Sequence, residues 1–178
     1  MKPRPCAKVG VQHIYGSKKS KPIYKSGAPL KIRTMSAESQ KIQVAALPYR
    51  RRENLIEVLL VTSRETKRWI IPKGWPMPNL KDFTAAKREA REEAGVTGQI
   101  GKIEIGRFEY LKRLKDGCSQ ECSVVVYPLK VEKLLQVWKE KKQRTRKWFS
   151  AEEACSLVHE PFLQDIIQNL QQKQKPSK

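Results

Sequence analysis

The 178-residue sequence lacks several features that would place it in other classes of protein. Its longest apolar runs, such as Leu55–Val61, have the length of a strand and are far too short to cross a membrane. The first residues, MKPRPCAKVG, contain no continuous apolar segment of the kind found in secretory signals. Four cysteines are too few for a disulfide framework and indicate reduced thiols. We therefore expect a cytoplasmic protein without a membrane segment.

Acidic residues are scarce, and the first 37 residues contain none. With seven Lys and two Arg, these residues carry +9 of the formal net charge of +19. Residues 1–38 are rich in Lys, Pro, Gly and Ser and lack hydrophobic periodicity, which predicts a flexible basic arm. A charge of this size attracts polyanions, such as nucleic acid, membrane phosphates or a highly phosphorylated small molecule. Charge alone does not choose among these partners.

Order is expected from residue 39 to residue 172, followed by a Lys-rich C-terminal tail at 173–178. Strand patterns occur at KIQVAALPYR, which is expected to end at Pro48, and at NLIEVLLVTSR, RWIIPKGW, QIGKIEIGRFEYLKRL, CSVVVYPLKV and KWFS. The last of these leads through Ser150 and Glu153, a capping box, into the first of two C-terminal helices. The pattern predicts one α/β (α+β) domain with a mixed sheet.

A helix predicted at Phe83–Ala94, with Gly95 as its C-terminal stop, has an unusual charge pattern. On a helix, Glu89 and Glu93 share a face and Glu92 adjoins them, so the three carboxylates repel one another. A solvated helix face is the commoner reason for such a run of glutamates. A hard divalent cation is the other reason, because Mg²⁺ prefers carboxylate oxygens and substrate phosphates.

The flanking residues favour the metal site. Six residues occur at fixed spacing: Gly74, Arg88, Glu89, Glu92, Glu93 and Gly95. This spacing resembles the Nudix box, G-x5-E-x7-R-E-U-x-E-E-x-G-U, in which U is a bulky aliphatic residue. Two positions depart from it, since Leu80 stands where the family has glutamate and Ala90 is small. The resemblance extends over about residues 41–170 and is strongest to diphosphoinositol polyphosphate phosphohydrolase-like, bacterial-type members, which share PKGWPM at the turn.

The resemblance implies a mixed sheet between helices and the hydrolysis of a diphosphate linked to another group. It implies that Glu89, Glu92 and Glu93 are catalytic and bind Mg²⁺ or Mn²⁺, with the carbonyl oxygen of Gly74 as a further ligand. One glutamate, from the box or from a later loop, would accept the proton of the attacking water. Glu109 and Glu121 are candidates for the later acid, although a structural role is the commoner one for each.

The resemblance also assigns structural roles to Arg88, Gly95 and position 80. In the family, Arg88 pairs with the first glutamate of the box, a partner that Leu80 removes. Asp82 is close in sequence and is a candidate both for that place and for the helix N-cap. We expect an active enzyme with a repacked loop.

Basic residues flank the box on both sides and favour an anionic ligand. They lie in the segments Arg50–Arg52, Ser63-Arg64, Lys67-Arg68, Lys112-Arg113 and Lys139–Lys147, and at Lys73. The predicted substrate contacts are Lys41, Ser63, Arg64, Lys73, Arg113 and Lys147. The resemblance to the diphosphoinositol subgroup places Lys41, Ser63, Arg64 and Lys147 first among them. For each residue alone, a solvated surface charge is the commoner role.

The leading hypothesis is a metal-dependent pyrophosphohydrolase acting on a highly anionic small molecule, either a diphosphoinositol polyphosphate or a dinucleoside polyphosphate. One alternative is a nucleotide or capped-RNA pyrophosphohydrolase. Another is a catalytically silent Nudix protein that binds nucleic acid, a partner not favoured here because the box glutamates are intact and no nucleic-acid-binding motif occurs. Both a monomer and a homodimer fit the sequence.

Overall fold

A computed structural model describes residues 41–53, 55–114 and 117–173. The predicted arm at 1–38 lies outside these residues, as does the C-terminal tail beyond Lys173. The elements in chain order are β1 (Lys41–Arg52), β2 (Leu55–Thr62), β3 (Trp69–Ile70), β4 (Lys73–Gly74), α1 (Asp82–Glu89), η1 (Ala90–Ala94), β5 (Val96–Ile100), β6 (Gly106–Arg113), β7 (Ser119–Leu134), β8 (Arg146–Ser150), α2 (Ala151–Leu157) and α3 (Pro161–Lys173). None of the helices in the described ranges is long and apolar enough to cross a membrane.

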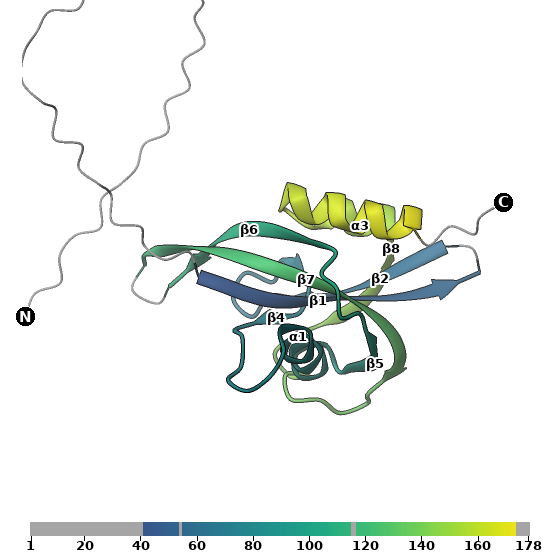
Figure 1. The fold of residues 1–178 in the computed structure, drawn as a ribbon, viewed down its shortest axis with the longest axis horizontal. Coiled ribbons are helices and arrows are strands. Elements are labelled where there is room, and N and C mark those ends of the chain that lie inside the picture. Colours follow the sequence, from purple (N-terminus) through teal and green to yellow (C-terminus); the bar gives the residue numbers. More distant parts are fainter. Residues whose placement is uncertain (1–40, 54, 115–116, 174–178) are drawn as a thin grey trace, which may run out of the picture. The chain divides into compact units, whose positions relative to one another are not determined.

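The strands form one mixed sheet with the central order β3-β2-β1-β7-β5 (Figure 1). At its sides, β4 pairs with β1, β6 with β7 and β8 with β2. The pair β1 and β7 is parallel, whereas the other pairs are antiparallel. Helix α1 covers one face and α3 the other (Figure 1). The predicted fold class, a mixed sheet between helices, is confirmed.

Each face of the sheet has its own apolar core. Val44 of β1 packs with Ala86 of α1 on one face, and the next residue, Ala45, packs with Ile167 of α3 on the other. This alternation follows from the two-residue period of a strand. Burial of both faces drives folding, because apolar surface is removed from water on two sides of the same strand.

Strand β1 continues past Pro48 to Arg52, so the predicted strand end at Pro48 is wrong. At one edge of β1, the N–H of Ala46 donates to the carbonyl of Pro72 (3.1 Å), and the pairing with β2 begins at Tyr49. Backbone groups two residues apart point to the same side of a strand. The missing N–H of Pro48 therefore falls between these two partners, where no ladder hydrogen bond is lost.

The predicted box helix forms, but it begins one residue early and changes geometry along its length. Segment α1 is α-helical, and its continuation η1 is a π-type turn. Lys81 occupies the N-cap position without a side-chain hydrogen bond, so Asp82 is not the cap. Gly95 ends the helix at φ +60°, a left-handed conformation that glycine adopts at little cost, which confirms the predicted stop.

A basic side chain from β8 holds the end of this helix. The guanidinium of Arg146 donates to the carbonyls of Ala94, Gly95 and Leu135, each at 2.8 Å. It also lies 4.0 Å from the centre of the Trp138 ring. A cation at a helix C-terminus complements the helix dipole. The contact joins the box helix to the loop between β7 and β8.

The first C-terminal helix, α2, begins with the predicted capping box. The hydroxyl of Ser150 accepts a hydrogen bond from the N–H of Glu153 (3.2 Å). The carboxylate of Glu153 in turn accepts one from the N–H of Ser150 (2.9 Å). The reciprocal pair satisfies two backbone donors at the helix start, as the sequence predicts.

Candidate active site

The box glycine and Glu89 lie in direct contact. In the β1–β4 pair, Gly74 lies opposite Val44, whose side chain belongs to the core on the α1 face. A side chain at position 74 would place its Cβ 2.2 Å from the carboxyl carbon of Glu89. Only glycine leaves room for this carboxylate against the backbone. A close approach therefore explains the glycine at the start of the box.

The environment of Glu89 suits a cation. The side chain is half-buried and, within the described ranges, makes no hydrogen bond or ion pair. Its pKa is raised, first by burial and then by the negative charges of Glu92 and Glu140. Carboxylate and backbone carbonyl oxygens are ligands that Mg²⁺ and Mn²⁺ prefer. The oxygen donors of Glu89 and Gly74 therefore fit a hard divalent cation.

Glu93 is buried and both of its carboxylate oxygens are engaged. One accepts a hydrogen bond from the backbone N–H of Lys73 (3.1 Å), and the other pairs with the guanidinium of Arg144. Burial raises the pKa of Glu93 to about 7, and the Arg144 charge and the Lys73 N–H oppose this rise. Glu93 thus ties the box helix to β4 and to the loop that carries Arg144.

Glu92 is engaged by basic side chains at the surface. The Nζ of Lys139 donates to it at 2.5 Å and the Nε of Arg88 at 2.9 Å. Both hydrogen bonds lower the pKa of Glu92, the one from Lys139 most. Arg88, which lacks its family partner because residue 80 is leucine, therefore pairs with Glu92 of the box itself. Asp82 does not replace that partner.

The three box glutamates do not meet at one point. In the described ranges, no group of three or more His, Cys, Asp or Glu side chains could hold a metal ion. Gly74 and Glu89 come together, whereas Glu92 and Glu93 bind Lys and Arg side chains. The catalytic and metal-binding roles of Glu89, Glu92 and Glu93 stay predictions.

A fourth glutamate, which sequence reasoning missed, lies near this group. Glu140 belongs to the β7–β8 loop, residues 135–145, and its charge raises the pKa of both Glu89 and Glu93. Its carboxylate accepts a hydrogen bond from the Nε of Arg144 (2.5 Å). The segment KEKKQRTRK places this acid among six basic residues in the sequence.

The two later acids considered from the sequence lie elsewhere in the fold. Glu109 is in β6 and Glu121 is in β7, in the hairpin that the two strands form. Neither lines the cavity described next. The acid from a later segment whose charge raises the pKa of both Glu89 and Glu93 is Glu140, beyond β7.

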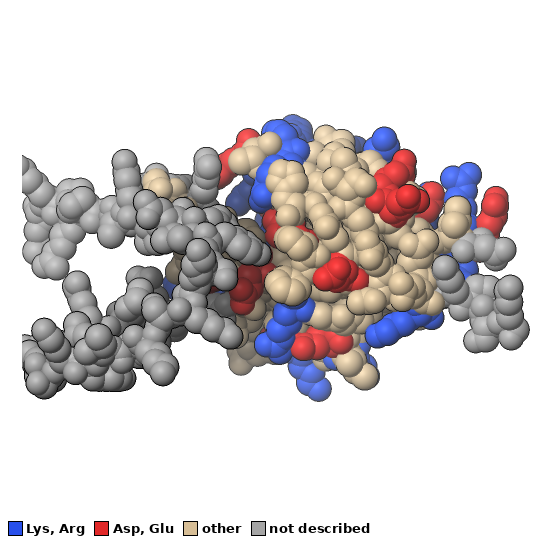
Figure 2. Space-filling model, turned by 90° about the horizontal axis from the view of Figure 1, so that it is seen from above, with Lys and Arg blue, Asp and Glu red and all other residues tan. Residues whose placement is uncertain are grey.

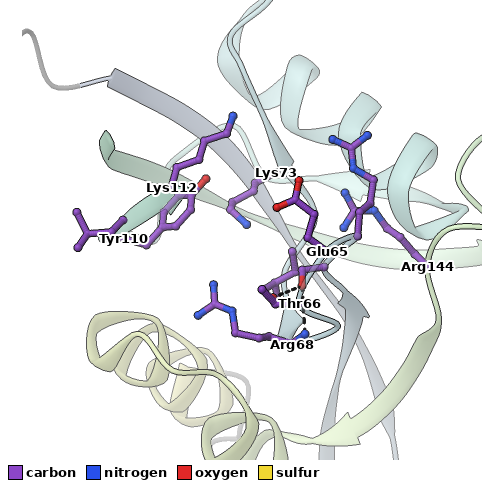
Figure 3. A pocket seen from close by; sticks show the side chains of 11 residues that line it. Glu65, Thr66, Arg68, Lys73, Tyr110, Lys112 and Arg144 are labelled. Atoms are coloured by element: carbon purple, nitrogen blue, oxygen red, sulfur yellow. Dashed lines mark hydrogen bonds between the residues drawn. The ribbon is translucent and has the colours of Figure 1, made fainter. Parts of the chain in front are cut away.

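A cavity of about 360 Å³ is lined by Lys73 and Arg144, the two residues that bind Glu93 (Figure 3). Five of the lining residues are basic and one is acidic: Arg64, Arg68, Lys73, Lys112 and Arg144, with Glu65. In Figure 3, Lys73 lies between Tyr110 and Lys112 on one side and Glu65 and Arg144 on the other. A cavity with such an excess of positive charge attracts compact, highly charged anions.

The cavity brings together three of the six predicted substrate contacts: Ser63, Arg64 and Lys73. Lys41, the exposed first residue of β1, does not line it. Lys147 of β8 does not line it either, and its ammonium lies 5.0 Å from the centre of the Phe149 ring. Arg113 lies in β6, and its side chain is outside the part of the chain that the structure describes.

The six predicted contacts omit some residues that also line the cavity, among them Arg68, Tyr110, Lys112 and Arg144. The three basic ones belong to segments whose charge the sequence shows, but their neighbours carry the same charge. The sequence therefore does not show which of these basic residues line the cavity, whereas the fold does. Tyr110 carries no such signal.

The ammonium of Lys73 packs against an aromatic ring of the cavity wall. Its ammonium lies 4.8 Å from the centre of the Tyr110 ring, and the Tyr110 hydroxyl donates to Oε1 of Gln43 (2.6 Å). Burial lowers the pKa of Lys73 to about 8, and the charges of Glu93 and Glu160 oppose this. Lys73 is thus mostly protonated at neutral pH and offers a fixed cation to the cavity.

This chain matches a family model and several curated relatives. The NUDIX domain family model matches residues 40–170. The chain is 36% identical over 147 residues to human diphosphoinositol polyphosphate phosphohydrolase 3-beta, covering 80% of this chain and 85% of that protein. It is 33% identical over 118 residues to Nudix hydrolase 12, mitochondrial, of Arabidopsis thaliana, covering 65% of this chain and 58% of that protein.

Solved structures agree at the level of the fold. An Ap4A hydrolase of C. elegans has a TM-score of 0.55 at 21% identity, covering 75% of this chain and 98% of that one. A NUDIX hydrolase from Nitrosomonas europaea has a TM-score of 0.58 at 17% identity, covering 76% of this chain and 91% of that one. The chain belongs to the Nudix family. The expected enzyme class, a Nudix pyrophosphohydrolase, and the resemblance to the diphosphoinositol polyphosphate phosphohydrolases are confirmed.

Proposed function

We propose that this chain is a metal-dependent pyrophosphohydrolase that cleaves a diphosphate linkage in a highly anionic small molecule, a diphosphoinositol polyphosphate or a dinucleoside polyphosphate. One observation carries the proposal. The Glu89 carboxylate, which has no ion-pair partner in the described ranges, lies against Gly74, and Glu93 of the same helix binds Lys73 and Arg144, two of the five basic residues that line the cavity. Acidic groups suited to a divalent cation thus adjoin basic groups suited to phosphates.

Glu89 and the carbonyl of Gly74 would hold Mg²⁺ or Mn²⁺. Glu93 would be a third ligand once its carboxylate releases Arg144 and binds the ion instead. A bound divalent cation would lower the pKa of a water molecule and stabilise charge on the phosphate oxygens. Lys73 and the arginines of the cavity would orient the diphosphate. A box glutamate or Glu140 would accept the proton of the attacking water. The cytoplasmic location expected from the sequence suits such a substrate.

The cavity favours phosphate groups over a nucleobase. Tyr110 is its only aromatic lining residue in the described part of the chain, and the Lys73 ammonium lies over its ring. A base would have to displace this ammonium in order to stack on that face. Among the anionic substrates, a phosphorylated inositol needs no stacking partner. This is also the substrate class in the name of the human relative.

A substrate panel tests the proposal. Diphosphoinositol species, dinucleoside polyphosphates, sugar nucleotides and 5′-triphosphate RNA are incubated with the full chain and Mg²⁺ or Mn²⁺, and the products are separated. We expect cleavage of the diphosphoinositol or dinucleoside substrates and no cleavage in EDTA. Salt-sensitive binding of RNA without cleavage of any diphosphate would support the silent nucleic-acid-binding alternative instead.

A further inference from the structure

Glu140, in the β7–β8 loop, makes polar contacts through its N–H, its carbonyl and its carboxylate. Its N–H donates to the carbonyl of Glu92 (3.1 Å), and its own carbonyl accepts from the N–H groups of Gln143 (2.9 Å) and Arg144 (3.0 Å). Its carboxylate accepts from the Nε of Arg144 (2.5 Å) and lies 3.9 Å from an Nη of Arg64. The N–H of Glu140 thus joins the β7–β8 loop to the box helix, and its carboxylate joins the loop to Arg64.

The two arginines that Glu140 contacts come from different parts of the fold and line the same cavity. Arg64 lies between β2 and β3, and Arg144 lies in the β7–β8 loop. The same two segments meet again where the Nζ of Lys67 donates to the carbonyl of Gln143 (3.0 Å). Glu140 is thus a carboxylate partner that the two guanidinium groups share.

The two arginines differ in how firmly they are held without Glu140. The Arg144 side chain is buried, and its three nitrogens donate to Glu140, to the carbonyl of Thr62 (2.9 Å) and to Glu93. The Arg64 side chain is 61% exposed, and Glu140 is its only ion-pair partner in the described ranges. A long exposed side chain loses conformational entropy when it is fixed by a ligand. Prior fixation by Glu140 reduces that cost.

We propose that Glu140 is a positioning residue that holds Arg64 and Arg144 in place for the phosphate groups of the substrate. This inference rests on the proposed function, since it takes the cavity to be the phosphate site. An acid beside a polyanion also repels it, so two effects oppose each other at this position. If positioning dominates, removing the negative charge of Glu140 weakens the binding of a polyanion. If repulsion dominates, the same change strengthens it.

The chain offers a matched control in Glu65. This residue lines the same cavity, and in the described ranges it has no ion-pair partner. Glu65→Gln removes the same charge as Glu140→Gln without releasing an arginine. The two variants are equal in net charge, so any opposite effect on binding comes from positioning.

Inorganic tripolyphosphate is the probe, and its affinity is measured by calorimetry in EDTA with the full chain. We expect Glu140→Gln to raise the Kd by about five- to tenfold, while Glu65→Gln leaves it unchanged or lowers it. In a double-mutant cycle, Arg64→Met should cost less in the Glu140→Gln background than in the wild type. A lower Kd for Glu140→Gln, or additive effects of the two substitutions, would overturn the proposal.

Two further measurements separate this inference from other failures. Thermal unfolding shows whether Glu140→Gln stays folded, and Glu140→Asp, which keeps the charge, should recover part of the lost affinity. Hydrolysis of the substrate panel by the wild type tests the proposed function on its own. Tripolyphosphate binding that is insensitive to Glu140 in an active enzyme rejects the positioning role alone.

Discussion

Glu89 and Glu93 differ sharply from Glu92, although all three lie within five positions of one helix. Burial raises the pKa of the first two, whereas hydrogen bonds from Lys139 and Arg88 lower the pKa of the third. Identical side chains at box spacing thus receive opposite electrostatic environments. The neighbours that the fold supplies, more than the helix itself, set the chemistry of each carboxylate.

The difference also bears on Leu80. In the Nudix box the arginine pairs with a glutamate that precedes the helix, and here Arg88 turns to Glu92, four residues along (2.9 Å). Lys139 from the β7–β8 loop adds a second cation to the same carboxylate. The loss of one glutamate is therefore compensated within the helix, and the compensation engages an acid that the family pattern makes available to a metal. Figure 2 shows one face of the molecule, on which basic and acidic side chains are interspersed around a largely uncharged centre.

The largest effect is expected at the buried end of the helix. Glu93→Gln should reduce metal-dependent hydrolysis by roughly 10³-fold, because it removes a charge that the reaction centre requires. Leu80→Glu serves as the control and should change turnover little. Steady-state kinetics with the best substrate of the panel measures both variants. Full activity in Glu93→Gln would reject the catalytic assignment.

The two arginines that pair with box glutamates provide a second test of the contrast. The Arg144 side chain is 5% exposed and pairs with Glu93 and Glu140, so Arg144→Ala leaves Glu93 without an ion-pair partner in the described ranges and leaves Glu140 with Arg64 alone. We expect a loss of about 3–5 kcal/mol in the free energy of unfolding. Arg88 is 58% exposed, so we expect Arg88→Ala to lower the free energy of unfolding by at most about 1 kcal/mol. Urea unfolding of both variants measures the difference, and equal losses would contradict it.

A third prediction concerns the contact between Gly74 and Glu89. In Gly74→Ala, the added Cβ would meet the Glu89 carboxylate, so that carboxylate must move. We expect Mn²⁺ affinity to fall by about 10- to 100-fold, as when a metal ligand loses its orientation. Electron paramagnetic resonance of free Mn²⁺ gives the affinity without any need for turnover. Glu92→Gln, measured in parallel, should lower the affinity less. The reverse order would place the ion at the surface carboxylate.

The sequence predicts those parts of the fold that depend on local chemistry. The Ser150 capping box and the Gly95 stop follow from residue types at fixed offsets, and both are present. The predicted strand end at Pro48 was wrong, because a proline ends a strand only where its missing N–H would have donated to a neighbouring strand. The position of that neighbour depends on the whole sheet. The predicted helix start is also wrong, because the helix begins at Asp82 and Lys81 occupies the N-cap position without a side-chain hydrogen bond.

The candidate site also has a part that local spacing predicts and a part that it does not. Spacing within one helix identifies Glu89 and Glu93, and the glycine that meets Glu89 is part of the same motif. Glu140 and Arg144 reach the site from a loop some fifty residues further along the chain, in a segment whose charge reads as basic throughout. Hydrophobic periodicity does not show where such a loop lies in space, so the sequence could not predict that Glu140 and Arg144 reach the site.

The smallest effect is expected at Glu92, where pH gives a test with a definite sign. The folded pKa of Glu92 lies below its ordinary value of 4.5, because Lys139 and Arg88 donate to its charged form. The resulting stability is present above pH 4.5 and is lost as the pH falls through the lower folded pKa. Glu92→Gln should therefore cost less than about 1 kcal/mol at pH 7, and the stabilities of variant and wild type should converge below pH 4.5. Urea unfolding at a series of pH values measures this convergence. Arg88→Gln should converge with the wild type in the same way, because it removes the other side of the pair. A difference that persists in acid would mean that Glu92 contributes through packing, and its contrast with the buried pair would then not be electrostatic.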